Sequence, residues 1–184
     1  MLLIRIAVFV VVTLVLAWLS RAALLKPRSH GFARFFAWES ILALILMNLP
    51  VWSLNPFAPH QLVSWVCLIT SIILAIEGFR LLRIIGKPTA ARTDSELFGF
   101  EKTSSLVTVG IYRYIRHPLY AALLFLGWGA FLKEFSVAGI FLISVVSVGL
   151  FLTAKFDEAE CLKYFGPVYK DYMRRTKNFV PFVF

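Results

Sequence analysis

The segment GIYRYIRHPLY, from Gly110 to Tyr120, places ionisable and aromatic side chains directly before an apolar run. Pro118 suits the first position of a helix, because a backbone N–H at that position would have no partner within the helix. Arg116 and His117 would then lie at the helix N-terminus, where free N–H groups and the helix dipole favour an anion. The segment therefore predicts a carboxylate or phosphate site at the mouth of an apolar helix.

A purely interfacial role would explain the same residues. Arg113 and Arg116 would extend to lipid headgroups, as long basic side chains do near membrane surfaces. Tyrosines gather at that level and form an aromatic belt, which here would consist of Tyr112, Tyr114 and Tyr120. The segment by itself favours neither interpretation.

Two neighbouring acids, Asp157 and Glu158, follow the next apolar run. A helical hairpin made of the two runs would return these acids to the level of Arg116 and His117. There they would either pair with the basic residues and join the two helices, or bind a cationic or hydroxyl-bearing ligand above the hairpin. Both interpretations stay open at this point.

The elements that must position these groups are apolar. The chain has 184 residues, of which 60% are hydrophobic and 16% charged, and its mean hydropathy is +0.81. Soluble domains usually carry about 25% charged residues, so the composition indicates a polytopic membrane protein with an all-α fold. Hydropathy predicts about five spans close to the ~20 residues that a bilayer requires: 2–25, 35–54, 62–85, 120–131 and 135–155.

The net charge of +9 is unevenly distributed. Basic residues gather in segments 21–34, 80–116 and 155–177, whereas the connectors between the other span ends are nearly neutral. This is the positive-inside pattern, which argues against nucleic-acid binding and predicts an outside N-terminus with both long loops and the tail in the cytoplasm. The first run could also be a secretory signal, but its long core and the basic residues after it favour a retained span.

We expect a single membrane domain with three parts. Residues 1–85 would form three helices, 86–117 a cytoplasmic loop, and 118–184 the hairpin and a C-terminal helix. Gly166-Pro167 should separate two helical pieces of the tail, since glycine suits the position after a helix and proline the start of the next. The last piece reads as an amphipathic helix lying on the membrane or capping the bundle. Its predicted apolar face consists of Val168, Tyr169, Tyr172 and Met173.

A few further residues stand out. Glu39 and Glu77 lie in apolar spans, where acids are costly and become functional candidates. Arg80 could pair with Glu77 one turn away, whereas Glu39 has no evident local partner. The spacing of Cys67 and Cys161 fits no disulfide framework or metal site, so both are interpreted as packing residues. The three histidines are scattered, and we expect no metal site.

GIYRYIRHPLY together with DEAECLKYFGPVYKDYMRRTKNFVPF resembles the isoprenylcysteine carboxyl methyltransferase and phospholipid N-methyltransferase superfamily. The common pattern is RHPxY at the start of one hairpin helix, then an acidic pair, FGxxYxxY and a closing proline, and it covers roughly 105–184. The resemblance implies an integral membrane enzyme that uses S-adenosylmethionine. Its acceptor would be lipophilic, an isoprenylcysteine-type carboxylate or a lipid headgroup, and its site would lie at the cytoplasmic interface.

The resemblance also implies roles for individual residues. His117 and Tyr120 would hold the methionine end of the cofactor, while Glu158 would bind its ribose or amino groups. Arg116 would face the reacting centre or orient an acidic acceptor, so Arg116 and Glu158 are the implied catalytic residues. Aromatic faces suit a sulfonium cation. The implied cofactor-binding residues are Tyr112, His117, Pro118, Tyr120, Glu158, Phe165, Tyr169 and Tyr172.

Two positions depart from the pattern of the superfamily. Ala122 stands where many members have glycine, which should narrow the cofactor pocket, and Asn178 stands where many have arginine, which leaves the acceptor open. Two other functions stay open as well. One is an NADPH-dependent membrane reductase of the sterol type, whose C-terminal motifs look similar, and the other is a non-enzymatic membrane scaffold or small transporter.

Overall fold

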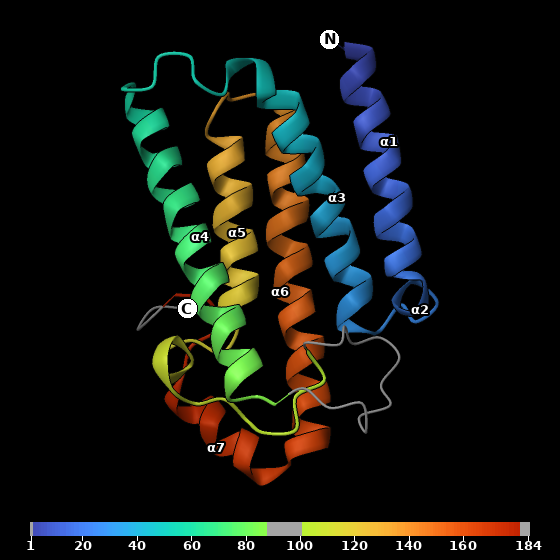
Figure 1. Ribbon diagram of the computed structural model, residues 1–184, viewed down its shortest axis with the longest axis vertical. Helices are drawn as coiled ribbons and strands as arrows, with labels where there is room; N and C mark the ends of the chain where they lie inside the picture. Colours follow the sequence, from blue (N-terminus) through green and yellow to red (C-terminus); the bar gives the residue numbers. More distant parts are fainter. Residues whose placement is uncertain (1, 88–100, 181–184) are drawn as a thin grey trace.

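The computed structural model describes residues 2–87 and 101–180, and Figure 1 shows that they form a bundle of helices. The predicted all-α membrane bundle is confirmed for this part of the chain. Arg92, Asp94 and Glu96 of the predicted loop and the closing Pro181 lie outside the described residues. The elements are α1 (Leu2–Leu19), α2 (Arg21–Leu24), α3 (His30–Asn48), η1 (Leu49–Val51), α4 (Pro59–Ile84), η3 (Gly110–Arg113), α5 (Pro118–Phe131), α6 (Val137–Phe165) and α7 (Pro167–Arg175).

Four helices of the described chain, α1, α3 with η1, α4 and α6, are long and apolar enough to cross a membrane. The protein is therefore an integral membrane protein. The remaining apolar helix, α5, has 14 residues, which is shorter than the ~20 residues that a bilayer core requires. Whether α5 is a fifth span stays a prediction.

Local chemistry sets several helix ends. α3 begins at His30, earlier than hydropathy predicts, because the Ser29 hydroxyl caps the helix by accepting a hydrogen bond from the Phe32 N–H at 3.3 Å. α5 begins with Pro118 as expected. α6 continues beyond the predicted end at Lys155, because the acids that follow find partners and remain helical. It ends at Gly166, whose φ of +61° suits glycine.

The helices pack as one bundle, in which α3 lies along α6 and α4 lies along α5. Small residues let α3 and α6 approach closely, since a Cβ added to Gly149 would lie 3.3 Å from the carbonyl oxygen of Ala33. α1 packs mainly against α3 and is otherwise exposed. The predicted N-terminal part and the hairpin therefore share one core, and α3 and α4 help to build whatever site the hairpin carries.

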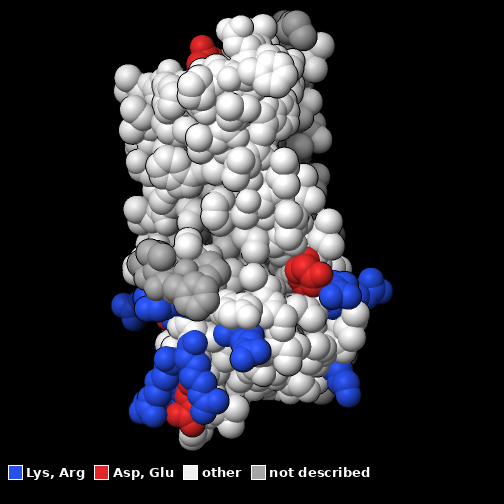
Figure 2. All heavy atoms as spheres, turned by 90° about the vertical axis from the view of Figure 1, so that its left-hand side faces the viewer, with Lys and Arg blue, Asp and Glu red and all other residues white. Residues whose placement is uncertain are grey.

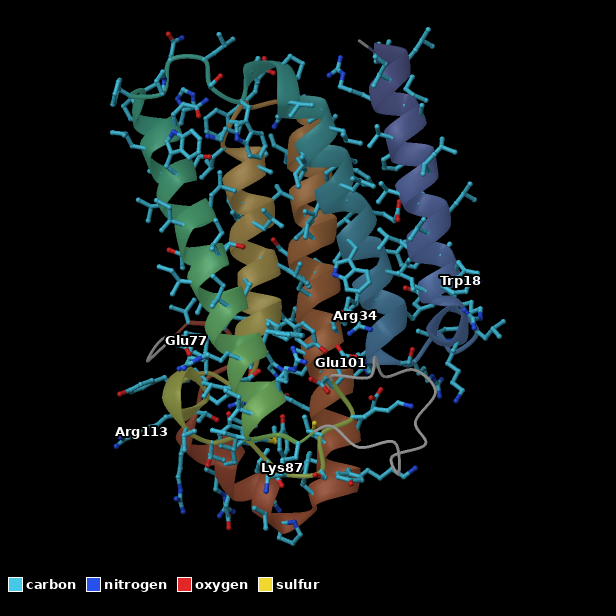
Figure 3. The ribbon with its side chains drawn as sticks, viewed as in Figure 1. Trp18, Arg34, Glu77, Lys87, Glu101 and Arg113 are labelled. Carbon is cyan, nitrogen blue, oxygen red and sulfur yellow. The ribbon has the colours of Figure 1, made fainter. Side chains whose placement is uncertain are left out.

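Charged side chains are concentrated at one end of the bundle. Figure 2 shows basic side chains near the lower end of one face, below a broad uncharged band. In Figure 3 the labelled Arg34, Lys87 and Arg113 lie at the same end. We call this the basic end. The connection from α1 to α3 lies there, as do the described residues between α4 and α5 (85–87 and 101–117) and α7.

Candidate functional site

A cavity of about 100 Å³ lies at the basic end, between α4, α5, α6, α7 and the segment that precedes α5. Nearly all of the site residues that the sequence predicts are on its wall. The exception is Glu158, which is buried beside the cavity but does not line it. The polar and aromatic wall residues are Glu101, Thr103, Tyr112, Arg116, His117, Tyr120, Asp157, Cys161, Phe165, Tyr169 and Tyr172.

His117 precedes α5 and is enclosed by the two acids of α6. Its Nδ1 lies 3.3 Å from Asp157 Oδ2 and its Nε2 3.7 Å from Glu158 Oε1. The ring stacks on Tyr120, with 5.4 Å between ring centroids. Burial disfavours the charged imidazole, but the neighbouring carboxylates of Asp157 and Glu158 outweigh burial and raise the pKa of His117 above 6.5. The hairpin thus returns the acids to the level of His117, as the sequence predicts.

All three side-chain nitrogens of Arg116 donate hydrogen bonds to other residues of the chain. Nε donates to Glu158 Oε1 at 2.8 Å, and a second nitrogen donates to the carbonyl oxygen of Met173 at 3.1 Å. Shorter bonds reach the Thr176 carbonyl and Asn178 Oδ1. The anion site predicted at this helix start is therefore filled by Glu158. In this structure the guanidinium of Arg116 joins structural elements, and the role that the resemblance implies for it at the reacting centre stays a prediction.

Asp157 and Glu158 have different environments, because successive helical residues point about 100° apart. Glu158 is 3% exposed and pairs with Arg116 at 2.7 Å and with Lys155 at 3.0 Å. Asp157 faces the cavity. Of the two acids, Asp157 is therefore the one on the cavity wall, and the role that the resemblance implies for Glu158 stays a prediction.

Aromatic residues of α6 and α7 form another part of the wall. The rings of Phe165 and Tyr169 stack at a centroid distance of 6.5 Å, and the Tyr172 hydroxyl donates to the carbonyl of Tyr112 at 2.7 Å. Burial raises the pKa of Tyr112, Tyr169 and Tyr172, so their hydroxyls stay protonated. Val168, expected on the apolar face of α7, is instead 65% exposed.

The segment after α7 is bonded to the chain just before α5. The Arg116 N–H donates to the Lys177 carbonyl at 2.8 Å, and Ile115 and Lys177 form a parallel bridge. Asn178, one of the two departures from the superfamily pattern, accepts a bond from Arg116. An arginine at 178 could not do so, because its side chain has only donors.

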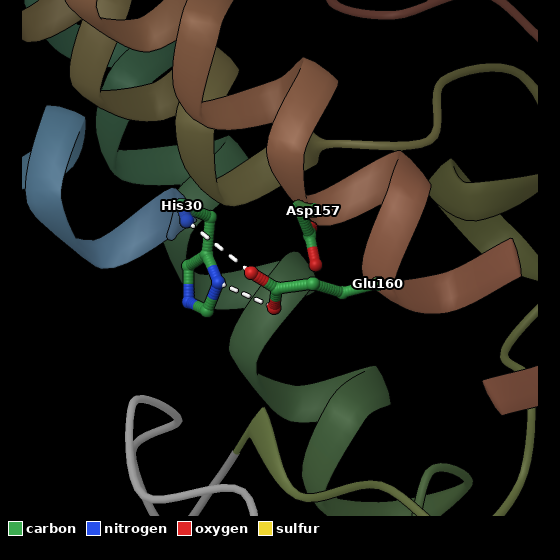
Figure 4. A group of neighbouring side chains, drawn as sticks. All are labelled: His30, Asp157 and Glu160. Carbon is green, nitrogen blue, oxygen red and sulfur yellow. Dashed lines mark hydrogen bonds and ion pairs between the residues drawn. The ribbon is translucent and has the colours of Figure 1, made fainter. Parts of the chain in front are cut away.

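Four residues that the sequence analysis did not assign to the site form a second cluster beside the cavity. His30 Nδ1 lies 2.7 Å from Glu160 Oε2, and the His30 backbone N–H donates to Glu160 Oε1 at 3.3 Å (Figure 4). Arg34, one turn further along α3, pairs with Glu101 (Figure 3). The Ser29 cap places His30 and Arg34 on one face of a helix, but it does not identify their partners, so the sequence contains no signal for this cluster.

His30, Asp157 and Glu160 also place one ligand atom each within 4.8 Å of the others, a spacing that could hold a cation. Two protein partners already account for this spacing, since Glu160 pairs with His30 and Asp157 with His117. We assign no metal there, and the absence of a metal site stays a prediction.

The other residues that stood out in the sequence lie in different parts of the bundle. The Thr13 hydroxyl donates to Glu39 at 2.6 Å and joins α1 to α3, which gives Glu39 the partner that the sequence did not reveal. Glu77 pairs with Arg80 at 3.1 Å on an exposed face, as expected. Ala122 is buried in α5 away from the cavity wall, so its methyl group does not narrow the cavity. Cys161 is a wall residue, not only a packing residue.

The cavity lies in the part of the chain that is similar to known proteins. Residues 59–175 match the model of a family described as phospholipid methyltransferase. The chain is also 29% identical over 110 residues to protein-S-isoprenylcysteine O-methyltransferase of Dictyostelium discoideum, a match that covers 55% of this chain and 44% of that protein. The chain thus spans less than half the length of this relative. Every wall residue of the cavity lies within the family match, whereas α3 lies outside it.

Proposed function

The chain belongs to the phospholipid methyltransferase family, and from this premise we propose that it transfers a methyl group from S-adenosylmethionine to a lipophilic acceptor. The observation that carries the proposal is the cavity at the basic end, where acids and aromatic rings meet at the end of the apolar helices. The relative's name gives an S-isoprenylcysteine acceptor and the family's name a phospholipid. Both acceptors are lipophilic.

The wall residues fit the functional groups of this cofactor. Glu101 and Asp157 can accept hydrogen bonds from an ammonium group or from ribose hydroxyls. The rings of Phe165 and Tyr169 suit a sulfonium cation or an adenine. His117 Nε2 is buried, makes no hydrogen bond and lies 3.7 Å from the nearest Glu158 oxygen, so it could donate to a polar group of a bound ligand. The donor set therefore matches an amino acid joined to a nucleoside.

The cavity must widen to bind such a ligand. Its volume of about 100 Å³ corresponds to roughly seven to ten water-sized positions, fewer than the non-hydrogen atoms of S-adenosylmethionine. Binding therefore requires part of the wall to move outwards, and ligand-dependent protection from hydrogen exchange should be found in the wall segments.

When bound, the cofactor supplies an activated methyl group. The residues of this chain would position the two reactants and exclude water, because in-line displacement depends more on alignment than on acid–base catalysis. The wall agrees with this role: its buried tyrosines keep their protons, and Asp157 is paired with His117. His117 would orient the cofactor while Asp157 compensates its charge.

The position of the cavity suits an acceptor that arrives from the membrane. The tail of such an acceptor would remain beside the apolar helices while its polar end reaches the basic end of the bundle. Basic segments favour the cytoplasmic side. We therefore propose an outside N-terminus and a site that faces the cytoplasm.

Cofactor binding by the detergent-purified protein tests the proposal. We expect saturable binding of S-adenosylmethionine that weakens roughly tenfold or more in His117→Ala and in Asp157→Ala. Lys133→Ala should bind normally, since Lys133 lies at the opposite end. Binding of NADPH instead of S-adenosylmethionine would favour the reductase, and binding of neither would favour a scaffold.

The acceptor class needs a second experiment. The protein with labelled S-adenosylmethionine should transfer label either into a total lipid extract or into prenylated peptides. Transfer into lipid alone would assign a phospholipid-type acceptor, and transfer into peptide alone an isoprenylcysteine. Transfer into neither, despite cofactor binding, would contradict a lipophilic acceptor of these two classes.

A further inference from the structure

Glu101 is an acid of the cavity wall. Neither the sequence motifs nor the comparisons with known proteins give it a role. Its side chain is 12% exposed, and it lies on the wall together with Asp157. The chain that follows it is fixed to the end of α4, because the Ser104 N–H donates to the Gly86 carbonyl at 2.9 Å. The Ser104 hydroxyl donates to the Lys87 carbonyl at the same distance. Glu101 therefore occupies a defined position.

Two basic residues of α3 brace the Glu101 carboxylate. Arg34 donates to Oε1, and His30 Nε2 lies 3.7 Å from Oε2. Both braces are themselves fixed, since the Arg34 guanidinium lies 4.9 Å from the ring of Trp38 and His30 is bonded to Glu160. His30 and Arg34 are 0% and 3% exposed. Such burial of charge is costly unless each group is paired.

The brace leaves the carboxylate able to bind a ligand. An ionised carboxylate offers about four acceptor positions, so a carboxylate that already has protein partners can also accept a hydrogen bond from a ligand. Glu160 provides an internal comparison, because it is held by the same His30 but does not line the cavity. A purely structural cluster would not require one of its acids to form the wall of a cavity.

We infer that Glu101 is a ligand-binding carboxylate, which accepts a hydrogen bond from the ammonium group or a ribose hydroxyl of the cofactor, and that Arg34 is the residue that positions it. This inference rests on the proposed function of the cavity. It extends the site to α3, which lies outside the family match. It also moves the ligand-binding role that the resemblance implied for Glu158 to Glu101 and Asp157.

Titration of the full-length, detergent-solubilised protein with S-adenosylmethionine tests the role of Glu101. Glu101→Gln keeps the shape but loses the charge, and we expect its affinity to fall roughly tenfold or more. Glu77→Gln is the matched control, because Glu77 also pairs with an arginine but is exposed and off the wall. Its affinity should equal that of the wild type, and thermal unfolding should verify that both variants are folded.

A double-mutant cycle tests the positioning role of Arg34. Arg34→Met should weaken binding in the wild-type background but add little in the Glu101→Gln background, because it acts through Glu101. Arg34→Lys should recover part of the affinity. If Arg34 were merely structural, Arg34→Met would cause the same loss in both backgrounds, and this result would overturn its assignment. If Arg34→Met does not fold, Arg34→Lys serves in the same cycle.

The ligand group can be identified with 5′-methylthioadenosine, which has the ribose but no amino-acid end. Equal weakening of both ligands in Glu101→Gln assigns a ribose hydroxyl, and weakening of S-adenosylmethionine alone assigns the ammonium group; both results support the inference. Unchanged affinity of Glu101→Gln, with normal binding by the wild type, overturns the inference while the proposed function stands. A wild type that does not bind S-adenosylmethionine overturns both.

Discussion

The two ends of the bundle are held together by different kinds of bond. At the end opposite the basic end, side chains of α3 and α4 donate to carbonyl oxygens near the C-terminus of α5: Asn48 to Ala130 at 2.8 Å and Ser64 to Gly129 at 2.7 Å. Carbonyl groups in the last turn of a helix lack the usual partner four residues further on. Lys133 Nζ donates to the Gln61 amide at 3.0 Å and lies 3.5 Å from the ring centroid of Trp65.

At the basic end, by contrast, charged side chains bind one another across long stretches of sequence. Arg34 and Glu101 are 67 residues apart, and His30 and Glu160 are 130 apart. At the opposite end the bonds of Asn48 and Ser64 involve no ionisable side chain, so they do not depend on pH. The basic end has a cavity among its charges, so its stability should respond to pH and to whatever binds there.

The largest effect should come from Arg116→Met. This substitution removes the side chain that joins α6, the end of α7 and residues 176–178 after it. Breaking this largely buried pair leaves Glu158 without its main partner, so the free energy of unfolding should fall by about 3–5 kcal/mol. Unfolding in detergent measures this. Arg113→Met is the control, since Arg113 is exposed on the same segment and should change stability by no more than about 0.5 kcal/mol. Equal losses would contradict the role given to Arg116.

Lys133→Met should lower the stability of the protein without changing its affinity for S-adenosylmethionine. Losing the bond to Gln61 and the contact with Trp65 should cost about 1–2 kcal/mol of stability. Affinity for S-adenosylmethionine should stay within about twofold of the wild type, because the two ends share no partners. A large loss of affinity in a folded Lys133→Met protein would show instead that the two ends are coupled.

A smaller effect should appear as a dependence on pH. The folded-state pKa of His117 is raised above 6.5, so its stabilising contribution is complete below that pH and is lost as the pH rises through the raised value. The stability advantage of the wild type over His117→Gln should therefore shrink at alkaline pH. A difference that stays constant from pH 6 upward, measured by unfolding in detergent, would show that the charge of His117 has no such role.

The smallest effect should come from Thr13→Val, which deletes the bond from α1 to Glu39. Single interhelical bonds in membranes contribute roughly 0.6 kcal/mol, and the affinity for the cofactor should not change. Ser144→Ala is the control, because Ser144 bonds only within its own helix, to the carbonyl of Ile140. A loss of cofactor affinity in Thr13→Val would mean that α1 influences the cavity.

Those features that depend on local chemistry could be predicted from the sequence. Pro118 and Gly166-Pro167 mark helix ends because of their own backbone properties, and the hairpin brings Asp157 to His117. Which of the two acids faces the cavity could not be predicted, because it depends on how α6 is rotated. Hydropathy ends that helix at Lys155, before either acid.

The contribution of α3 could not be predicted for a different reason. His30 and Arg34 lie in a basic segment that the positive-inside rule already explains, so nothing local distinguishes them. Their partners, Glu160 and Glu101, become neighbours only once α3 packs along α6. Long-range pairing of this kind has no signature in a single sequence.

The pairing of residues 176–179 with the segment before α5 also sets an order of events during synthesis. Arg116 and Thr176 are 60 residues apart, so at 5–20 residues per second Arg116 leaves the ribosome about 3–12 seconds before its last partners. During that interval the hairpin can insert into the bilayer, but the guanidinium must stay in water or among headgroups. The bonds from Arg116 to Thr176 and Asn178 can therefore form only after the hairpin has been synthesised, and a nascent chain that stalls at α7 would lack them.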